Sequence, residues 1–296
     1  MSATIESIAI VGAGRLGSSL AVALDAASHP VRTVSSRNAA SAEALATRID
    51  GARVAQPEDA VATCDLVFLT VPDGEIAPLA ASLPWRDGCF AVHCSGALTL
   101  DVLAPAAQAG TLTGCLHPLQ AFPAREGDAS RFHDIACGVE APPPLDATLE
   151  RIVADLGASV VRLEGVDRAR YHAAAVFASN YAVALAAAAR RAWELAGLPA
   201  DRARAALAPL MLGAAQNIAA VTNDDLATAL TGPIARGDIA TVERHLAAFE
   251  GNADTAPDGD PELAALYRRL GAELLALDLD HPPAVAARLR ELLEAG

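Results

Sequence analysis

An apolar run that passes directly into three regularly spaced glycines constrains this chain more than any other feature. Residues 8–17 read IAIVGAGRLG, so Gly12, Gly14 and Gly17 follow a strand-like segment and open a helix-like one. In this spacing the first glycine permits a tight turn, the second lets the backbone approach a pyrophosphate, and the third lets the helix pack on the sheet. The helix N-terminus then faces the anion. The sequence therefore predicts a dinucleotide-phosphate site that also includes Arg15 and Leu16, although Arg15 can equally be a surface residue.

The overall composition indicates a globular protein with small-molecule rather than polyanionic partners. The chain has 296 residues, is 53% hydrophobic and carries a formal net charge of −14. Nucleic acids are held by clustered cations, so a nucleic-acid partner is not expected. The N-terminus shows no basic region ahead of an apolar segment, and we expect a cytoplasmic protein. The length favours two domains.

Residue types that are rare or absent narrow the chemistry. All 22 basic residues are arginine, which excludes any mechanism that needs a lysine. The cysteine number is odd and contains no Cys-x-x-Cys pair, which favours buried, reduced thiols. A metal site built from His93, Cys94, Cys115 and His117 is disfavoured because adjacent strand residues point to opposite faces. We expect no bound metal.

The first half of the chain alternates strand-like and helix-like runs, which predicts an α/β domain with a parallel sheet over residues 1–164. The expected strands are Ile8–Val11, Val31–Ser35, Leu66–Val71, Phe90–Cys94, Thr113–Leu116, Ile135–Val139 and Val160–Leu163. The expected helices are Leu16–Ala26, Ala40–Ile49, Ile76–Leu83, Leu100–Ala109 and Leu145–Leu156. The continuous apolar run at 66–71 suits a strand that is covered on both faces.

The second half, residues 165–296, is rich in alanine and leucine and predicts an all-α domain. Asp167 is a plausible cap for its first helix. The expected helices are Arg168–Ala196, Ala200–Val221, Ile239–Phe249, Pro261–Leu277 and Pro283–Glu294, with a loop over Gly251–Asp260. The uncharged stretch Ala173–Ala189 is too short and too polar for a membrane span and is expected to be a buried helix. This domain can hold the substrate pocket and form a homodimer.

The residues after the second strand favour NADP over NAD. NAD-binding relatives of this fold place an acidic residue about 20 positions beyond the glycines. Here the corresponding stretch reads Ser35-Ser36-Arg37-Asn38 and contains no carboxylate. A guanidinium at Arg37 and a hydroxyl at Ser36 suit a 2′-phosphate. Alternatively, Ser36 and Asn38 cap the next helix and Arg37 is solvated, and both interpretations can hold together.

Polar residues follow three of the expected strands, at the edge of the sheet where a nicotinamide would lie. Val71 and Pro72 close one strand, His93 ends the next, and His117 precedes the proline that ends a third. Both prolines can serve simply as strand terminators. The two histidines are candidates for the wall of a reaction pocket.

The first helix of the second domain carries a polar stripe on an apolar background. His172 and Ser179 lie two turns apart and nearly in line, and Asn180 follows Ser179 about 100° further round the helix. Such a stripe is costly to bury unless it is paired or faces a cavity. His172 is the first choice for a proton donor, with Ser179 and Asn180 orienting a carbonyl or imine. A structural role for His172 is about as plausible.

A glycine-rich segment, TGPIARGD at 231–238, interrupts two later helices. Asp238 is expected to cap the helix that follows it. Arg236 and Thr231 are candidates for binding a substrate carboxylate and a reacting group.

Several motifs together carry a family resemblance: the glycine turn, HCSG at 93–96, HPLQAF at 117–122, YHAAAVFASNY at 171–181 and TGPIARGD at 231–238. The chain resembles the Rossmann-like proteins that carry a C-terminal domain of unknown function numbered 2520. The resemblance implies the 6-phosphogluconate dehydrogenase-like superfamily, in which a Rossmann domain precedes a helical and commonly dimeric domain. It implies an NADP oxidoreductase, but names no substrate.

The leading hypothesis is an NADP-dependent oxidoreductase that transfers hydride between the nicotinamide and a small carbonyl or imine. The missing lysine disfavours the β-hydroxyacid dehydrogenase and ketopantoate reductase activities of that superfamily. Two alternatives remain: a nucleotide-binding sensor or partner subunit without turnover, and a reductase of another cofactor such as a deazaflavin.

Overall fold

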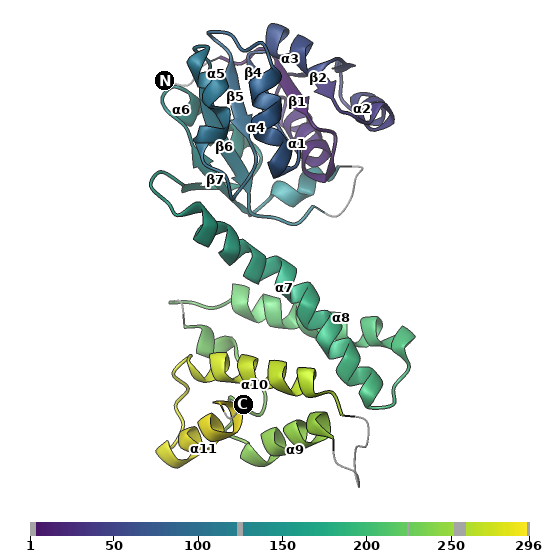
Figure 1. Cartoon of the computed structure of the whole chain (residues 1–296), viewed down its shortest axis with the longest axis vertical. Coiled ribbons are helices and arrows are strands. Elements are labelled where there is room, and N and C mark those ends of the chain that lie inside the picture. The colour runs from purple at the N-terminus through teal and green to yellow at the C-terminus, as the bar shows by residue number, and fades with distance from the viewer. Residues whose placement is uncertain (1–3, 123–126, 224, 252–258, 295–296) are drawn as a thin grey trace. The chain divides into compact units, whose positions relative to one another are not determined.

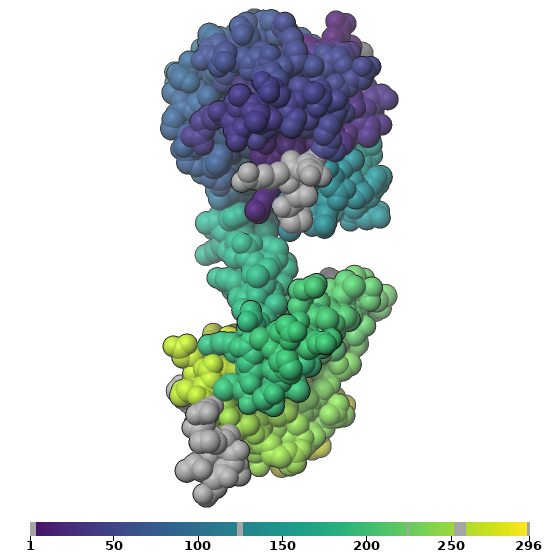
Figure 2. Space-filling model, turned by 90° about the vertical axis from the view of Figure 1, so that its right-hand side faces the viewer, coloured from purple at the N-terminus to yellow at the C-terminus, as the bar shows by residue number. Residues whose placement is uncertain are grey.

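The computed structural model describes residues 4–122, 127–223, 225–251 and 259–294. The chain divides into two compact units, residues 1–179 and 180–296, and the division falls inside one long helix. Figure 1 shows the first unit in purple to teal and the second in green to yellow, and Figure 2 shows the surfaces of both in the same colours. The boundary predicted at 164/165 lies shortly before the start of that helix at Arg168 and stays a prediction.

The first unit is built on an eight-stranded sheet in the order β3-β2-β1-β4-β5-β6-β7-β8. Its strands are β1 (Ile8–Val11), β2 (Val31–Ser35), β3 (Arg53–Val54), β4 (Leu66–Leu69), β5 (Phe90–His93), β6 (Leu112–Pro118), β7 (Ala136–Glu140) and β8 (Ser159–Arg162). Strands β2 and β3 lie on one side of β1, and the later strands, from β4 onward, lie on the other side. The strand order therefore switches between β1 and β4, and β1 runs parallel to both β2 and β4. Ligands of open α/β sheets bind outside the carboxyl ends of the strands at such a point.

One strand pair departs from the predicted parallel sheet. β7 runs antiparallel to β6, with Pro118 opposite Cys137 and Cys115 opposite Glu140. The segment between them holds only a short 3₁₀ turn, Ala129–Phe132, among its described residues. Because the described residues of this segment form no crossover helix, β7 begins at the end of the sheet where β6 finishes. It therefore runs antiparallel to β6.

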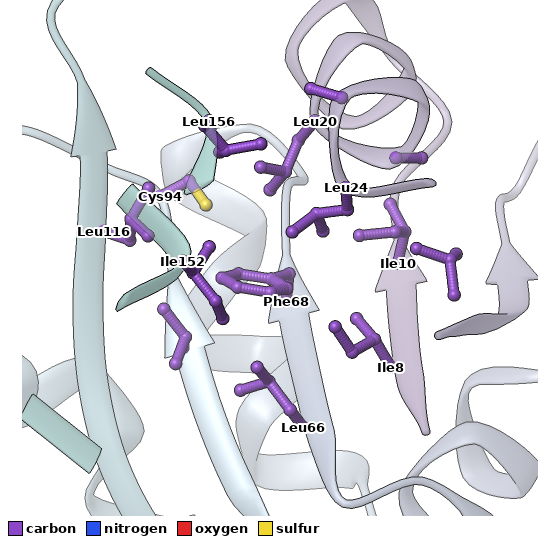
Figure 3. Close-up of a cluster of buried hydrophobic side chains, with 14 of the residues drawn as sticks. Ile8, Ile10, Leu20, Leu24, Leu66, Phe68, Cys94, Leu116, Ile152 and Leu156 are labelled. Carbon is purple, nitrogen blue, oxygen red and sulfur yellow. The ribbon is translucent and has the colours of Figure 1, made fainter. Parts of the chain in front are cut away.

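Helices cover both faces of the sheet, as its continuous apolar strands predict. One face packs against α1 (Arg15–Ala26), α2 (Ala39–Ala46) and α6 (Leu145–Asp155), and the other against α3 (Pro57–Thr63), α4 (Asp73–Ser82) and α5 (Ala104–Gln108). Figure 3 shows the first of these cores, in which side chains from β1, β4 and β6 meet leucines of α1 and apolar residues of α6. Side chains alternate between the faces, so Leu116 lies in this core while Cys115 and His117 point to the opposite face.

The second half of the chain is helical, as predicted. Its helices are α7 (Arg168–Leu195), α8 (Ala200–Ala219), α9 (Ile239–Glu250), α10 (Pro261–Leu275) and α11 (Pro283–Glu294). Asp167 and Asp238 accept backbone hydrogen bonds at the starts of α7 and α9, which confirms both predicted caps. A small core of Ile234, Val242, Leu246, Leu289 and Leu293 holds α9 and α11 together. Most of the loop predicted over Gly251–Asp260 lies outside the described residues.

Helix α7 is more exposed than the sequence predicted. Among the described residues it is the one helix whose length and composition would allow a membrane span, and few of its side chains are buried. Phe177 and Val183 are 69% and 72% exposed. The expectation of a buried helix is therefore wrong for the single chain, because an alanine-rich stretch reads as apolar whether or not anything covers it.

Candidate functional site

The glycine turn between β1 and α1 has the geometry that its spacing predicts. Gly12 adopts a φ of +119°, and a Cβ there would come within 2.8 Å of the Thr70 backbone. A Cβ on Gly17 would lie only 1.9 Å from the Gly12 carbonyl oxygen. The Thr70 hydroxyl donates to that same oxygen at 2.8 Å, which ties the turn to the end of β4. Both glycines are therefore required by the close approach of α1 to the sheet.

Gly14 differs, because a Cβ there would meet no heavy atom within 4 Å. It is the N-terminal cap residue of α1, and helix geometry leaves the N–H groups of the first turn without partners inside the helix. No acidic side chain stands in that turn. Open space, unpaired amide donors and the positive end of a helix dipole together make a site for a phosphate group.

A cavity of about 420 Å³ extends from this turn across the ends of β1, β2 and β4. Of the nine residues that the sequence predicted at a cofactor, seven line it and two, Leu16 and Gly17, do not. Its walls are formed by Val11, Gly12, Ala13, Gly14, Arg15, Ser35, Ser36, Arg37, Asn38, Ser41, Pro57, Thr70, Val71, Pro72, Glu75 and Leu79.

The end of this cavity beyond β2 contains a cation and an anion in contact. The Arg37 guanidinium lies 3.5 Å from the Glu75 carboxylate, which comes from the first turn of α4. The Asn38 side chain accepts from the Ser41 amide and caps α2, and the Ser36 hydroxyl accepts from the Asn38 amide. The capping interpretation is therefore confirmed for Asn38, while Arg37 stays exposed beside the cavity.

A second group of polar side chains lies where β6 passes beyond the end of β5. The His117 Nδ1 atom is 2.9 Å from the Tyr171 hydroxyl of α7. The His117 ring also meets the ring of His172 edge to face, with centroids 6.1 Å apart. The structure thus brings together two of the predicted histidines and adds a tyrosine.

Two glycines make room for this pair. A Cβ on Gly96 would come within 2.6–2.8 Å of three atoms of the His117 ring. A Cβ on Gly138 would come within 2.5 Å of the Tyr171 hydroxyl. Each glycine belongs to a strand or strand end next to β6, so any larger residue would displace the imidazole or the phenol.

Arg168, the first residue of α7, has a buried side chain that ties the start of this helix to the sheet. Arg168 is 5% exposed and forms an ion pair with Glu140 of β7, and its other nitrogen lies 3.6 Å from the Cys115 sulfur. Glu140 and Cys115 face each other across β6 and β7. Because Tyr171 and His172 follow Arg168 within two turns, the ion pair determines where both rings lie.

His93 lies beneath the pair and is fully buried. Its Nδ1 atom accepts from the Ser95 amide at 3.2 Å. The Ser95 hydroxyl donates to Asp73, the residue that follows Pro72 in the cavity wall, at 2.8 Å. This network links the histidine region to the cofactor-sized cavity through the start of α4.

Burial keeps these histidines neutral. The pKa of His117 is lowered to about 4, first by burial and then by the nearby His172 and Arg168 charges, against an opposing effect of Asp73. The pKa of His93 is also lowered to about 4, by burial and by Arg168. Burial raises the pKa of Tyr171 to about 12. At neutral pH the His93 and His117 imidazoles are therefore uncharged and the Tyr171 phenol keeps its proton.

The other predicted site residues belong to the end of the first unit and to the second unit. Ser179, two turns beyond His172, is exposed and donates its hydroxyl to the Ala175 carbonyl of its own helix. Asn180 begins the second unit. Thr231 and Arg236 also belong to that unit and are exposed, in a loop that His281 holds through a 2.8 Å contact with the Ile234 carbonyl.

The cysteines follow the expected pattern. All five cysteines are free and buried, and burial raises the pKa of Cys115 to about 11. Within the described residues, no group of three or more His, Cys, Asp or Glu side chains is arranged to hold a metal ion.

Sequence reasoning missed Tyr171, Arg168, Glu75 and Asp73. Tyr171 stands directly before His172 in the motif that was noticed, but its partner is 54 residues away in the sequence. The one available signal for Arg168 was a charged residue at the start of a helix, which is common on surfaces and carries no indication of burial.

Comparison with known families agrees with this architecture. Residues 2–118 match the family model of a Rossmann-like domain, and residues 135–274 match that of a domain of unknown function, DUF2520. The chain therefore combines these two domains, which confirms the resemblance noted in its motifs. No curated protein sequence matches the chain.

Solved structures from several organisms share the fold. A candidate NADP oxidoreductase from Bacteroides fragilis is 26% identical, with 91% of this chain and 97% of that one covered and a TM-score of 0.68. A protein from Thermotoga maritima is 28% identical, with the same coverage and a TM-score of 0.66. A reductive aminase from Aspergillus terreus in complex with NADPH is 18% identical, with 99% and 93% covered and a TM-score of 0.58. At that identity the last likeness concerns the fold alone.

Proposed function

We propose that the protein is an NADP(H)-dependent oxidoreductase that transfers hydride between the nicotinamide and a small carbonyl or imine compound. The observation that carries this proposal is one cavity that begins at a glycine-rich helix N-terminus and ends at an exposed arginine, with neutral histidines beyond the neighbouring strand ends. The similarity to a candidate NADP oxidoreductase and the fold shared with a reductive aminase solved in complex with NADPH support it.

The residues of the cavity fit this cofactor. The pyrophosphate would lie on the open side of Gly14, against the amides of Arg15, Leu16 and Gly17. Arg37 and Ser36 would bind the 2′-phosphate, because a guanidinium provides paired donors to a phosphate and a hydroxyl adds another. Val71 and Pro72 would pack against the nicotinamide half, and the bound cofactor supplies the hydride.

The protein's own contribution to the chemistry would come from the histidine group. His117 and His172 are both within reach of proton transfer to a substrate oxygen or nitrogen placed at the ends of β5 and β6. His172 is the donor that the sequence favours, with His93 buried behind as a wall. Ser179, Asn180, Thr231 and Arg236 are proposed to orient the substrate, with Arg236 binding a carboxylate.

The cofactor assignment is tested by comparing Arg37→Ala with Arg53→Ala, an exposed arginine of β3 that does not line the cavity. A lost charge-assisted hydrogen bond costs about 1.5–3 kcal/mol. Arg37→Ala should therefore weaken NADPH binding by roughly ten- to a hundredfold, while NADH binding and the control stay near wild type. Equal losses for both nucleotides would reject the 2′-phosphate assignment. NADPH binding without hydride transfer to any carbonyl or imine would favour a sensor.

We also propose that the protein is a homodimer. Large apolar side chains of α7 and α8, among them Val183, Leu210 and Leu212, are exposed in the single chain. Exposed apolar surface of this extent marks an interaction site. Sedimentation equilibrium should show a dimer that Leu210→Glu converts to monomer, and a monomeric wild type would contradict the proposal.

A further inference from the structure

We infer that His117, rather than His172, donates the hydrogen bond to the reacting group, and that Tyr171 holds His117 in the tautomer with its proton on Nε2. This inference rests on the proposed function and identifies the polar group that acts on the substrate. The arrangement that supports it is the Tyr171–His117 hydrogen bond between two glycine contacts.

His117 is the more firmly fixed of the two imidazoles. Gly96 lies against its ring, and a methyl group there would overlap three ring atoms. The Tyr171 hydroxyl is hydrogen-bonded to its Nδ1 atom, and the His172 ring contacts the His117 ring edge to face. The buried Nδ1 atom of His172, in contrast, has no hydrogen-bond partner among the described residues. A group that acts on a substrate must be held close to one geometry, which favours His117.

The hydrogen-bond inventory determines which atom of the pair donates. A phenol carries one proton, and a neutral imidazole carries one proton on either nitrogen. Among the hydrogen bonds of the described residues, the Tyr171 hydroxyl is joined to His117. If His117 donated from Nδ1, the half-buried hydroxyl proton would lack an acceptor, at a cost in free energy. The phenol therefore donates to Nδ1, and the imidazole proton lies on Nε2.

Burial and the neighbouring charges together favour the neutral form of His117. Burial has the largest effect, His172 and Arg168 of α7 also disfavour a second proton, and Asp73 of α4 favours one. A neutral Nε2–H polarises a carbonyl by hydrogen bonding without the need for an imidazolium ion. Arg168 is thus a positioning residue, because its ion pair with Glu140 fixes the start of α7.

In a carbonyl reduction, His117 and Tyr171 together can supply the proton that the substrate oxygen needs. A cofactor bound in the cavity would supply the hydride, two electrons and a proton, to the carbonyl carbon, and the π electrons would move to oxygen. The Nε2 proton of His117 passes to that oxygen while the Tyr171 proton passes to Nδ1. The imidazole remains neutral as the other tautomer, and the phenolate takes a proton from water, which leaves as hydroxide. The reverse sequence oxidises an alcohol.

The test compares Tyr171→Phe with Tyr267→Phe. Tyr267 makes the same 2.9 Å hydrogen bond to Nδ1 of His245 in the second unit, so its variant removes an equivalent bond that does not involve His117. Imidazole ¹⁵N shifts of the labelled protein report the tautomer of each histidine. Wild type should show His117 with a protonated Nε2, and Tyr171→Phe should convert it to a tautomer mixture. Tyr267→Phe should leave the His117 signals unchanged.

Turnover provides the second measurement, with NADPH and a panel of α-keto acids and cyclic imines. General acid catalysis contributes about 10²–10⁴-fold, so Tyr171→Phe and His117→Ala should each lose on the order of a hundredfold in kcat. NADPH affinity should stay unchanged in both, and the control Tyr267→Phe should keep the wild-type turnover. A protonated Nδ1 of His117 in wild type, or loss of turnover in His172→Ala alone, would overturn the inference.

The same measurements separate this inference from the proposed function. Failure of wild type to bind NADPH would reject the function, whereas the ¹⁵N tautomer would still show whether Tyr171 orients His117. Normal NADPH turnover in Tyr171→Phe would reject the inference and leave the function standing.

Discussion

Two alanine substitutions in the glycine turn should affect different properties: Gly17→Ala the stability of the fold, and Gly14→Ala the affinity for the cofactor. Gly17→Ala places a methyl carbon 1.9 Å from the Gly12 carbonyl oxygen, whereas Gly14→Ala places one in open space. A carbon–oxygen contact needs more than about 3 Å, so Gly17→Ala requires α1 to move roughly 1 Å or more away from β1. Helix propensity favours alanine by only about 1 kcal/mol. Overpacking against backbone exceeds that gain, and we expect a net loss of about 2–4 kcal/mol.

Gly14→Ala should leave the fold intact and weaken the binding of the cofactor. Gly14 has φ −86° and ψ −166°, a conformation open to alanine, so the expected stability change is within about 1 kcal/mol. Its new methyl group would occupy the space proposed for the pyrophosphate. We expect NADPH affinity to fall by at least about tenfold, or about 1.4 kcal/mol.

Tryptophan fluorescence can report the unfolding of the first unit by itself. The chain has two tryptophans, and Trp85 is buried in the core beneath α4. In a Trp193→Phe background, Trp85 fluorescence during urea unfolding reports the stability of this unit alone, and NADPH titration reports affinity. A Gly17→Ala protein as stable as its parent would refute the packing argument, and a Gly14→Ala protein with unchanged NADPH affinity would refute the phosphate position.

Two further outcomes follow from the charges of the site. The pKa values of His93 and His117 are lowered to about 4 from 6.5, so the folded state binds fewer protons than the unfolded chain between those values. The free energy of unfolding should therefore fall as the pH drops from 6.5 toward 4, by less in His93→Asn, and urea titrations that show no such fall would contradict the assignment. Glu75→Gln should strengthen NADPH binding by up to about fivefold, because an exposed ion pair contributes at most about 1 kcal/mol; calorimetry with NADH as the control should show no change for that nucleotide.

Local patterns were sufficient for most secondary structure. The apolar runs of β1, β2 and β4 and the periodic segments of α1, α6 and α10 were identified to within a few residues, because each carries its own pattern and a terminating residue. The two-residue strand β3 and the short helix α3 were missed, since neither is long enough to show a period. The direction of β7 depends on how the chain travels from β6 to β7. The apolar pattern of a strand by itself does not show this.

The candidate site was only partly predictable for a similar reason. The glycine turn and Arg37 were predicted from local spacing alone, and in the structure both line one cavity. The Tyr171–His117 bond, the glycine contacts of Gly96 and Gly138, and the Arg37–Glu75 pair each join segments far apart in the chain.

The sequence by itself determined the alternation of strands and helices, the phosphate-binding turn and the absence of lysine chemistry, because these are local or compositional properties. The tertiary structure alone decided which histidine has a fixed orientation, which charges are buried and which faces of α7 stay uncovered. Hydrogen bonds and burial depend on distances across the fold, and the return of β7 beside β6 places Gly138 and Glu140 where α7 can bring Tyr171 onto His117.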